Sequence, residues 1–250
     1  MKNLFTNNQL EGFMIFSHKR NWKAILSLLE ETLDKNQFFF FFDSERGYHL
    51  KVFSPSIIKN QLDTISSYLV YLPVSETTVS EDPLFRNVPE NTLHNIKYIP
   101  QTINITYPDN LASNEYVIFL NNLSSVVVDA LRYNDFFVEE KNRINFAIQL
   151  IFMALVKANK EQIKKELVET LENTPNNIDN NSPLVNFYRE VQQIESEEKI
   201  ENWVINWLNV ASDFLNKAPF HTLVESICTM LEIRNFAPQL LYTTKAVLQY

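Results

Sequence analysis

Residues 37–53, QFFFFFDSERGYHLKVF, constrain the fold more than any other stretch of this chain. The five consecutive phenylalanines from Phe38 to Phe42 have no polar face, so the segment must be covered on both sides. Its length and aromatic content favour a central strand of a sheet over a buried helix. A charged turn follows, in which Gly47 can adopt a positive φ, and YHLKVF then alternates as a returning strand. We therefore predict a buried aromatic hairpin.

Two polar residues lie on the predicted returning strand, where His49 and Lys51 share one face with Phe53. A strand holds such side chains more rigidly than a loop does. Each residue has two interpretations. His49 is either a half-buried histidine bonded to a neighbour or a functional imidazole. Lys51 is either a solvated lysine or a cation that orients a carboxylate-bearing peptide.

Apolar periodicity predicts helices in most of the remaining chain. Asn21 is a candidate N-cap for a helix over 22–33, and Ser54 with Pro55 indicates a second helix start at 54–56. Residues 71–118 read as strands and loops, with a short alternation at 103–107. The predicted later helices are 119–133, 138–172 (of which 144–156 is apolar nearly all round), 200–214, 220–232 and 236–249. The expected fold class is α+β, with a sheet in the N-terminal half and helices in the C-terminal half.

The 250 residues suffice for one large domain, and we predict a single domain over 1–250. The stretch 172–183, ENTPNNIDNNSP, is polar, proline-bounded and without apolar periodicity. It is predicted to be a mobile surface loop between helices, and a domain linker is the alternative.

Composition excludes several classes of function. Only Gly12 and Gly47 are glycines, so a glycine-rich phosphate-binding loop cannot be built. The net charge of -8 disfavours general binding to nucleic acid or anionic membranes. The single cysteine, Cys228, excludes an intramolecular disulfide and a zinc site of several thiolates, and the four histidines are too far apart for a local metal motif. We expect a cytoplasmic protein with no membrane span.

Four segments together carry a family resemblance. Residues 38–53 resemble a family pattern of F-F-I-R-Y, an acidic turn and H-L-R-L-R-F, and residues 98–101 (YIPQ) resemble Y-x-P-E. Residues 119–124 (FLNNLS) resemble a helix start, F-x-x-D-S, and 226–235 (SICTMLEIRN) resemble a helix with S-x-x-H-M-x-x-N-R. In this order they are similar to the C-terminal domain of lantibiotic dehydratases, which also occurs alone as the thiopeptide-type bacteriocin biosynthesis domain and in thiopeptide pyridine synthases.

The resemblance implies an activity on a ribosomally made precursor peptide. The family domain eliminates glutamate from glutamylated serine or threonine to give dehydroamino acids, as a carbon-oxygen lyase that needs no metal or organic cofactor. A separate subunit would glutamylate the precursor peptide. By this resemblance Lys51 and Arg234 would hold the glutamyl carboxylate and His49 would move the proton. His221, at the start of a predicted helix, is a second candidate for the proton transfer, with capping or surface packing as its alternative.

The chain departs from the family pattern where the chemistry would be. Family arginines fall on Phe42, Lys51 and Phe53, and in the C-terminal helix the histidine and asparagine fall on Thr229 and Ile233. A lysine lacks the bidentate fork of arginine. A non-catalytic subunit that binds the precursor peptide is therefore an alternative. A pyridine-synthase-like cyclase that joins two dehydroamino acids is another.

Overall fold

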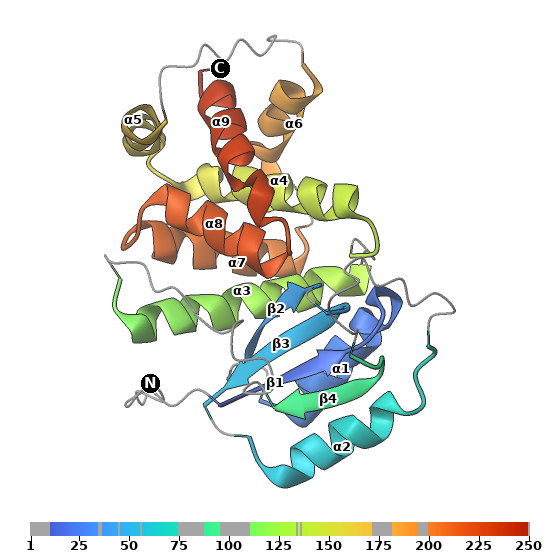
Figure 1. Ribbon diagram of the computed structural model, residues 1–250. Coiled ribbons are helices and arrows are strands. Elements are labelled where there is room, and N and C mark those ends of the chain that lie inside the picture. The colour runs from blue at the N-terminus through green and yellow to red at the C-terminus, as the bar shows by residue number, and fades with distance from the viewer. Residues whose placement is uncertain are drawn as a thin grey trace. The chain divides into compact units, whose positions relative to one another are not determined.

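A computed structural model of the chain describes residues 11–34, 37–44, 46–55, 57–74, 88–95, 111–133, 135, 137–171, 182–194 and 200–249. The chain divides into two compact units, Met1–Val138 and Glu139–Tyr250, and each is described by itself. Figure 1 labels their helices and strands. The single domain over 1–250 stays a prediction.

The first unit is built on an antiparallel sheet. Its described strands are β1 (Glu11–Phe16), β2 (Phe39–Asp43), β3 (His49–Ser54) and β4 (Thr92–Asn95), in the spatial order β2-β3-β1-β4. The predicted aromatic hairpin is confirmed, because β2 pairs with β3 and its four phenylalanines are buried. The predicted central position of this strand is wrong for the described sheet, in which β2 lies at one end.

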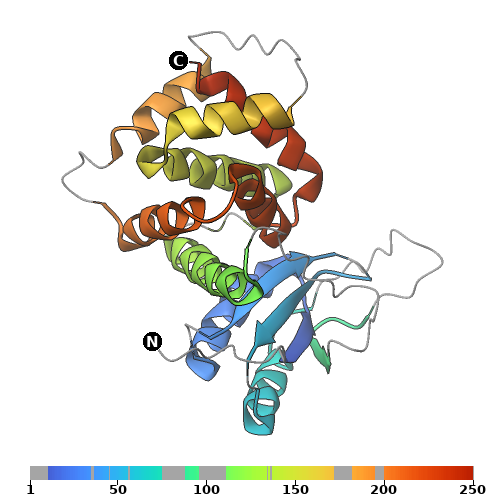
Figure 2. The same cartoon turned by 90° about the vertical axis from the view of Figure 1, so that its left-hand side faces the viewer.

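A helix explains why an edge strand is buried all round. Helix α3 (Ser113–Tyr133) packs along β2, as Figures 1 and 2 show. The hydroxyl of Ser124 accepts a hydrogen bond from the backbone N–H of Phe40 at 3.2 Å. An edge strand exposes unpaired backbone groups unless another element covers it, and α3 covers this one.

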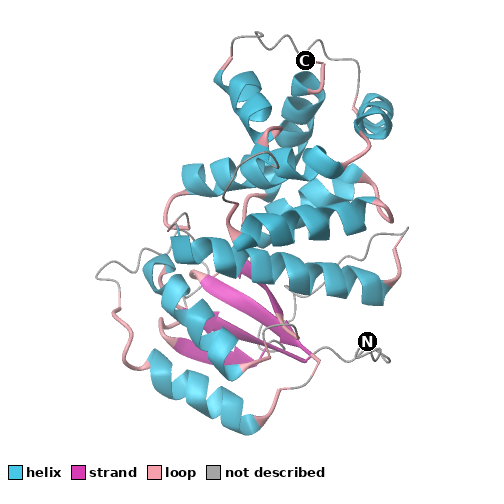
Figure 3. Cartoon of the chain, turned by 180° about the vertical axis from the view of Figure 1, so that it is seen from behind, coloured by secondary structure: helices cyan, strands magenta, loops and turns pink. Residues whose placement is uncertain are grey.

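Helices α1 (Trp22–Thr32) and α2 (Lys59–Leu69) lie on one face of the sheet. Figure 3 shows the sheet from the side of these helices. As predicted, α1 buries the stripe that starts at Trp22, whose ring stacks on Phe42 with centroids 4.3 Å apart. Asn21 precedes α1 as predicted, but its amide does not cap the helix. That amide instead donates to Ser17 Oγ and to the Pro73 carbonyl, both at 2.9 Å.

Helix α2 begins later than predicted. Ser54 is still in β3, where it pairs with Glu11, and the sheet ladder keeps it extended. The helix begins at Lys59, and the N–H of Ile58 donates to Gln61 Oε1 at 3.0 Å at this end.

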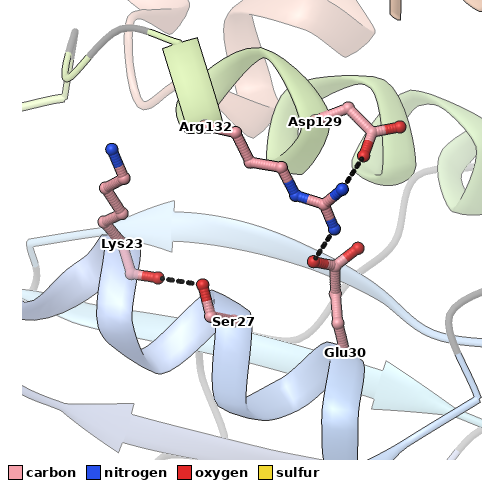
Figure 4. A network of polar contacts seen from close by, with 5 residues as sticks. All are labelled: Lys23, Ser27, Glu30, Asp129 and Arg132. Carbon is pink, nitrogen blue, oxygen red and sulfur yellow. Dashed lines mark hydrogen bonds and ion pairs between the residues drawn. The ribbon is translucent and has the colours of Figure 1, made fainter.

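An ion pair links α1 to α3 on the surface of the first unit (Figure 4). The guanidinium of Arg132 is 2.7 Å from Glu30 Oε2 and 3.3 Å from Asp129 Oδ1. The hydrogen bond to Glu30 raises the pKa of Arg132. Because the Arg132 side chain is 57% exposed, the pair contributes less than about 1 kcal/mol.

The second unit is helical throughout its described part, as predicted. Its helices are α4 (Glu140–Lys157), α5 (Lys160–Thr170), α6 (Pro183–Val191), α7 (Asn202–Leu215), α8 (Phe220–Met230), the short 3-10 helix η5 (Arg234–Phe236) and α9 (Ala237–Val247). The apolar stretch of α4 and the stripe of α7 are buried as predicted. Trp207 of α7 donates its indole N–H to the Leu150 carbonyl at 2.8 Å.

Two further helix boundaries differ from prediction. The stretch 138–172 is two helices, because Asn159 interrupts it and its side chain accepts from the N–H of Gln162 to cap α5. Helix α3 begins at Ser113, so residues 119–124 lie inside a helix and not at its start.

Several predictions fall outside the described residues. These are the alternation at 103–107, the 98–101 segment, and the loop at 172–183 apart from its last two residues. Of the described helices, none is long and apolar enough to cross a bilayer.

Candidate functional site

One face of the sheet gathers the polar residues of the aromatic hairpin. In the β2-β3 register Asp43 is opposite His49, and Lys51 is opposite Phe41. Since side chains alternate along a strand, Asp43, His49 and Lys51 all project from the same face. The hairpin therefore places a carboxylate, an imidazole and an ammonium side by side.

Lys51 forms an ion pair with Asp43 across the hairpin. Lys51 is only 6% exposed, whereas the Asp43 side chain is 25% exposed. A buried ammonium requires a compensating charge, and Asp43 supplies it. The first interpretation of Lys51, as a solvated lysine, is therefore wrong, because the side chain is buried and paired.

His49 is fully buried. Its Nδ1 is 2.9 Å from the Gly47 carbonyl, and since a carbonyl can only accept, Nδ1 carries the proton of this hydrogen bond. The ring stacks on Phe16 of β1, with centroids 4.4 Å apart. The turn that His49 closes has Gly47 at φ +114°, where any other residue would be strained.

A second histidine occupies the same sheet face. His94 of β4 is opposite Met14, which is opposite Lys51, and its ring meets Phe16 edge-on at 5.7 Å. His94 is half-buried, and desolvation lowers its pKa. The two histidines thus flank Phe16 although they are distant in sequence. Among the described residues, no three His, Cys, Asp or Glu side chains converge as ligands of a metal ion would.

His221 lies in the second unit, in the first turn of α8, and is held by Glu166 of α5. Glu166 accepts the backbone N–H groups of Phe220 and His221 at 2.9 and 3.0 Å, and its Oε1 is 2.8 Å from His221 Nδ1. A carboxylate at a helix N-terminus is favoured by the free N–H groups there. It also fixes the orientation of the imidazole, which is 36% exposed.

Arg234 is exposed and lies just beyond the C-terminus of a helix, as predicted, although that helix ends two residues before the predicted 232. Helix α8 ends at Met230, and the chain turns at Glu232, which has φ +57°. Here the N–H of Glu232 bonds to the Thr229 carbonyl and that of Ile233 to the Cys228 carbonyl, which is the Schellman arrangement with glutamate in place of the usual glycine. Arg234 then opens the 3-10 helix η5.

A buried arginine compensates this unusual turn. Arg143 of α4 is 4% exposed, forms an ion pair with Glu232 and donates to the Leu231 carbonyl at 3.3 Å. Glycine at position 232 would fit the positive φ but would leave the buried Arg143 without its carboxylate partner. This pairing explains why the position holds glutamate.

The predicted site residues belong to two different units. His49 and Lys51 share one sheet face in the first unit. His221 and Arg234 both belong to the second unit, but His221 lies in the first turn of α8 and Arg234 follows the turn beyond its last residue, and the helix is about 15 Å long. These two residues are not brought together.

Sequence reasoning missed Asp43 and Glu166. The hairpin register would have found Asp43, because counting outward from the turn places it opposite His49. Nothing in the local sequence pairs Glu166 with His221, which are 55 residues apart.

No protein-family model matches the chain, and no curated protein matches it. Among solved structures, it is similar to the pyridine synthase TbtD from thiomuracin biosynthesis. The identity is 11%, the alignment covers 96% of each chain, and the TM-score is 0.49. At these values the function has to be argued from the residues of this chain.

Proposed function

We propose that this protein binds a glutamylated precursor peptide during the biosynthesis of a lantibiotic- or thiopeptide-type ribosomal peptide. The support is the ordered resemblance of 38–53, 119–124 and 226–235 to the family segments. The described parts of these segments lie on the β2-β3 hairpin, in α3 and at the end of α8. The proposal places the protein in the cytoplasm, with a separate glutamylating subunit as its partner.

One observation favours binding without catalysis. Lys51, which stands at the position of a family arginine, is buried and already paired with Asp43, and His49 beside it is fully buried. A base must come within roughly 2.6–3.2 Å of the proton that it removes. A cation that holds a glutamyl carboxylate would also have to leave Asp43. We therefore assign Lys51 and His49 to the stability of the hairpin.

Glutamate elimination is the second candidate. It is favoured by the orientation of His221 by Glu166, which is how a carboxylate positions a proton-transferring imidazole, and by the exposure of Arg234. In this reaction His221 is the base that removes the α-proton, the electron pair forms the Cα=Cβ bond, and the Cβ–O bond breaks. Glutamate departs with its carboxylate held by Arg234, the exposed cation of the predicted set.

A reconstituted assay separates these functions. The precursor peptide, its glutamylating enzyme and glutamyl donor are combined with or without this protein, and the product is followed by mass spectrometry. For a binding subunit, we expect the protein to retain the precursor in a pull-down and dehydration to stay undetectable. Elimination would appear as loss of the glutamyl mass, and cyclisation as a ring with release of the leader.

Variants test the residue assignments in the same assay. Elimination predicts that His221→Phe and Arg234→Ala abolish dehydration, while Lys59→Ala, at an exposed residue of α2, leaves it unchanged. If wild-type protein neither binds the precursor peptide nor changes it, the proposed function is wrong.

A further inference from the structure

A basic turn lies at one end of the sheet in this acidic protein. Lys19, Arg20 and Lys23 fall within five residues, and no acidic residue occurs between Glu11 and Glu30. The turn comprises η1 (Lys19–Asn21) and the first residues of α1. Lys23 is four residues from Lys19 and three from Arg20, a spacing that makes it a neighbour of both cations on a helical surface.

The basic turn is held in place by contacts with its own unit. His18 caps η1 by accepting the N–H of Arg20 at 3.3 Å. The ammonium of Lys19 lies 4.2 Å from the ring centroid of Tyr48, an exposed residue of the hairpin turn. Asn21 is buried and bonded to Ser17 and Pro73. A surface that is ordered before binding loses less entropy when its partner arrives.

Two of the cations are available to a partner. Arg20 and Lys23 are exposed, and neither forms an ion pair with a described residue. In Figure 4 dashed contacts join Arg132 to Glu30 and Asp129, and none reaches the ammonium of Lys23. Arg132 is thus neutralised, whereas Arg20 and Lys23 keep their charge for a ligand.

We infer that the basic turn docks an acidic segment of a peptide, with Tyr48 beside the carboxylates. The inference rests on the proposed function, since it assigns a surface to the precursor peptide. The chain carries a net charge of -8. A nucleic acid or an anionic bilayer presents negative charge over a wide area, which the rest of this surface repels. A short acidic peptide segment contacts only the basic turn and so avoids the repulsion from the rest of the surface.

The first unit offers a matched control at the other end of its sheet. The basic turn follows Phe16, which pairs with His49 at the start of β3, whereas α2 follows Ser54 at the end of β3. Lys59, the first residue of α2, is exposed. In the second unit, Lys165 of α5, with a side chain 79% exposed, provides another control cation. Arg20→Glu/Lys23→Glu and Lys59→Glu/Lys165→Glu change the net charge equally.

The experiment measures fluorescence anisotropy of a labelled peptide of alternating glutamate and serine, against the same peptide with glutamine in place of glutamate. We expect wild type and the Lys59/Lys165 control to bind the acidic peptide alike and the Arg20/Lys23 variant to bind it roughly tenfold more weakly. Affinity should fall with added salt. Equal loss in both variants, or equal binding of the glutamine peptide, would overturn the inference. So would tighter binding to phosphatidylserine vesicles or to an oligonucleotide.

The same variants separate this inference from the proposed function. If the precursor peptide binds wild type and the Arg20/Lys23 variant equally well, the docking surface is wrong while the proposed function stands. If wild type binds the glutamate-serine peptide through the turn but ignores the precursor peptide, the proposed function fails and the docking surface stands.

Discussion

The ammonium of Lys51 and the carboxylate of Asp43 form an ion pair across the aromatic hairpin, two residues away from direct register. The pair stands beside His49 on a sheet face where every other neighbour on β2 and β3 is a phenylalanine. The buried ammonium of Lys51 is tolerated because the carboxylate of Asp43 compensates its charge, so the two residues must be considered together.

Asp43→Asn should lower the free energy of unfolding by about 2 kcal/mol, because a buried ammonium loses the carboxylate with which it pairs. Urea unfolding measures the change. In the Asp43→Asn background, Lys51→Met should restore part of the loss, since methionine keeps the apolar stem and removes the charge. A double variant no more stable than Asp43→Asn alone would contradict the coupling of these residues.

The Ser124 hydroxyl is expected to stabilise the edge of the sheet. Ser124→Ala leaves the buried N–H of Phe40 without this acceptor, which should cost about 1–2 kcal/mol and speed hydrogen exchange at the Phe40 amide. Ser27→Ala is the control, because its hydroxyl bonds only to a carbonyl of its own exposed turn. That change should stay within about 0.5 kcal/mol. Equal effects of the two substitutions would refute a special role for Ser124.

Local patterns predicted most elements but not the order of the strands. The phenylalanine run has no polar side, and burial by a neighbouring strand or by a helix leaves the same signature in sequence. Here α3 supplies the cover, through Ser124 and the apolar face around it. The inner strand β1, with the short apolar run from Phe13 to Phe16, was not predicted, because four residues give too little periodicity to separate from a loop.

The candidate site was predictable only as far as short-range geometry reaches. Alternation along one strand placed His49 and Lys51 on a common face, which the structure confirms. His94 joins that face through β1 and β4, a pairing that no local pattern encodes. The separation of His221 from Arg234 arises from the length of α8, and the Schellman turn at Glu232 was hidden because its usual glycine is absent.

His94 predicts a dependence of stability on pH. Desolvation lowers the pKa of His94 in the folded protein below its ordinary value of 6.5. Well above pH 6.5 the ring is neutral in both the folded and the unfolded chain, so the contribution of His94 to the free energy of unfolding is fully present. As the pH falls below 6.5, the unfolded chain takes up the proton first, so stability is lost. Urea unfolding as a function of pH should show a shallower decline for His94→Gln, and an unchanged slope would contradict this.

Cys228 should be inert in the native protein. The thiol is fully buried in α8, and burial raises its pKa to about 12. Thiolate is the reactive form, so a thiol reagent at mildly alkaline pH should label Cys228 only after urea unfolds the chain. Stability should also fall as the pH rises from about 9 towards 12, because the unfolded chain releases this proton first. Rapid labelling without urea would show that the helix opens locally.

Glu166 should stabilise the start of α8 independently of His221. Its carboxylate accepts the N–H groups of Phe220 and His221, and Glu166→Ala leaves both without it, which should lower the free energy of unfolding by about 1–2 kcal/mol. Glu166→Gln retains one acceptor oxygen and should lose about half as much. His221→Phe keeps the cap and removes only the imidazole, so hydrogen exchange at the Phe220 amide should accelerate in Glu166→Ala and stay unchanged in His221→Phe. Equal acceleration in both variants would mean that the imidazole, and not the backbone cap, holds Glu166 in place.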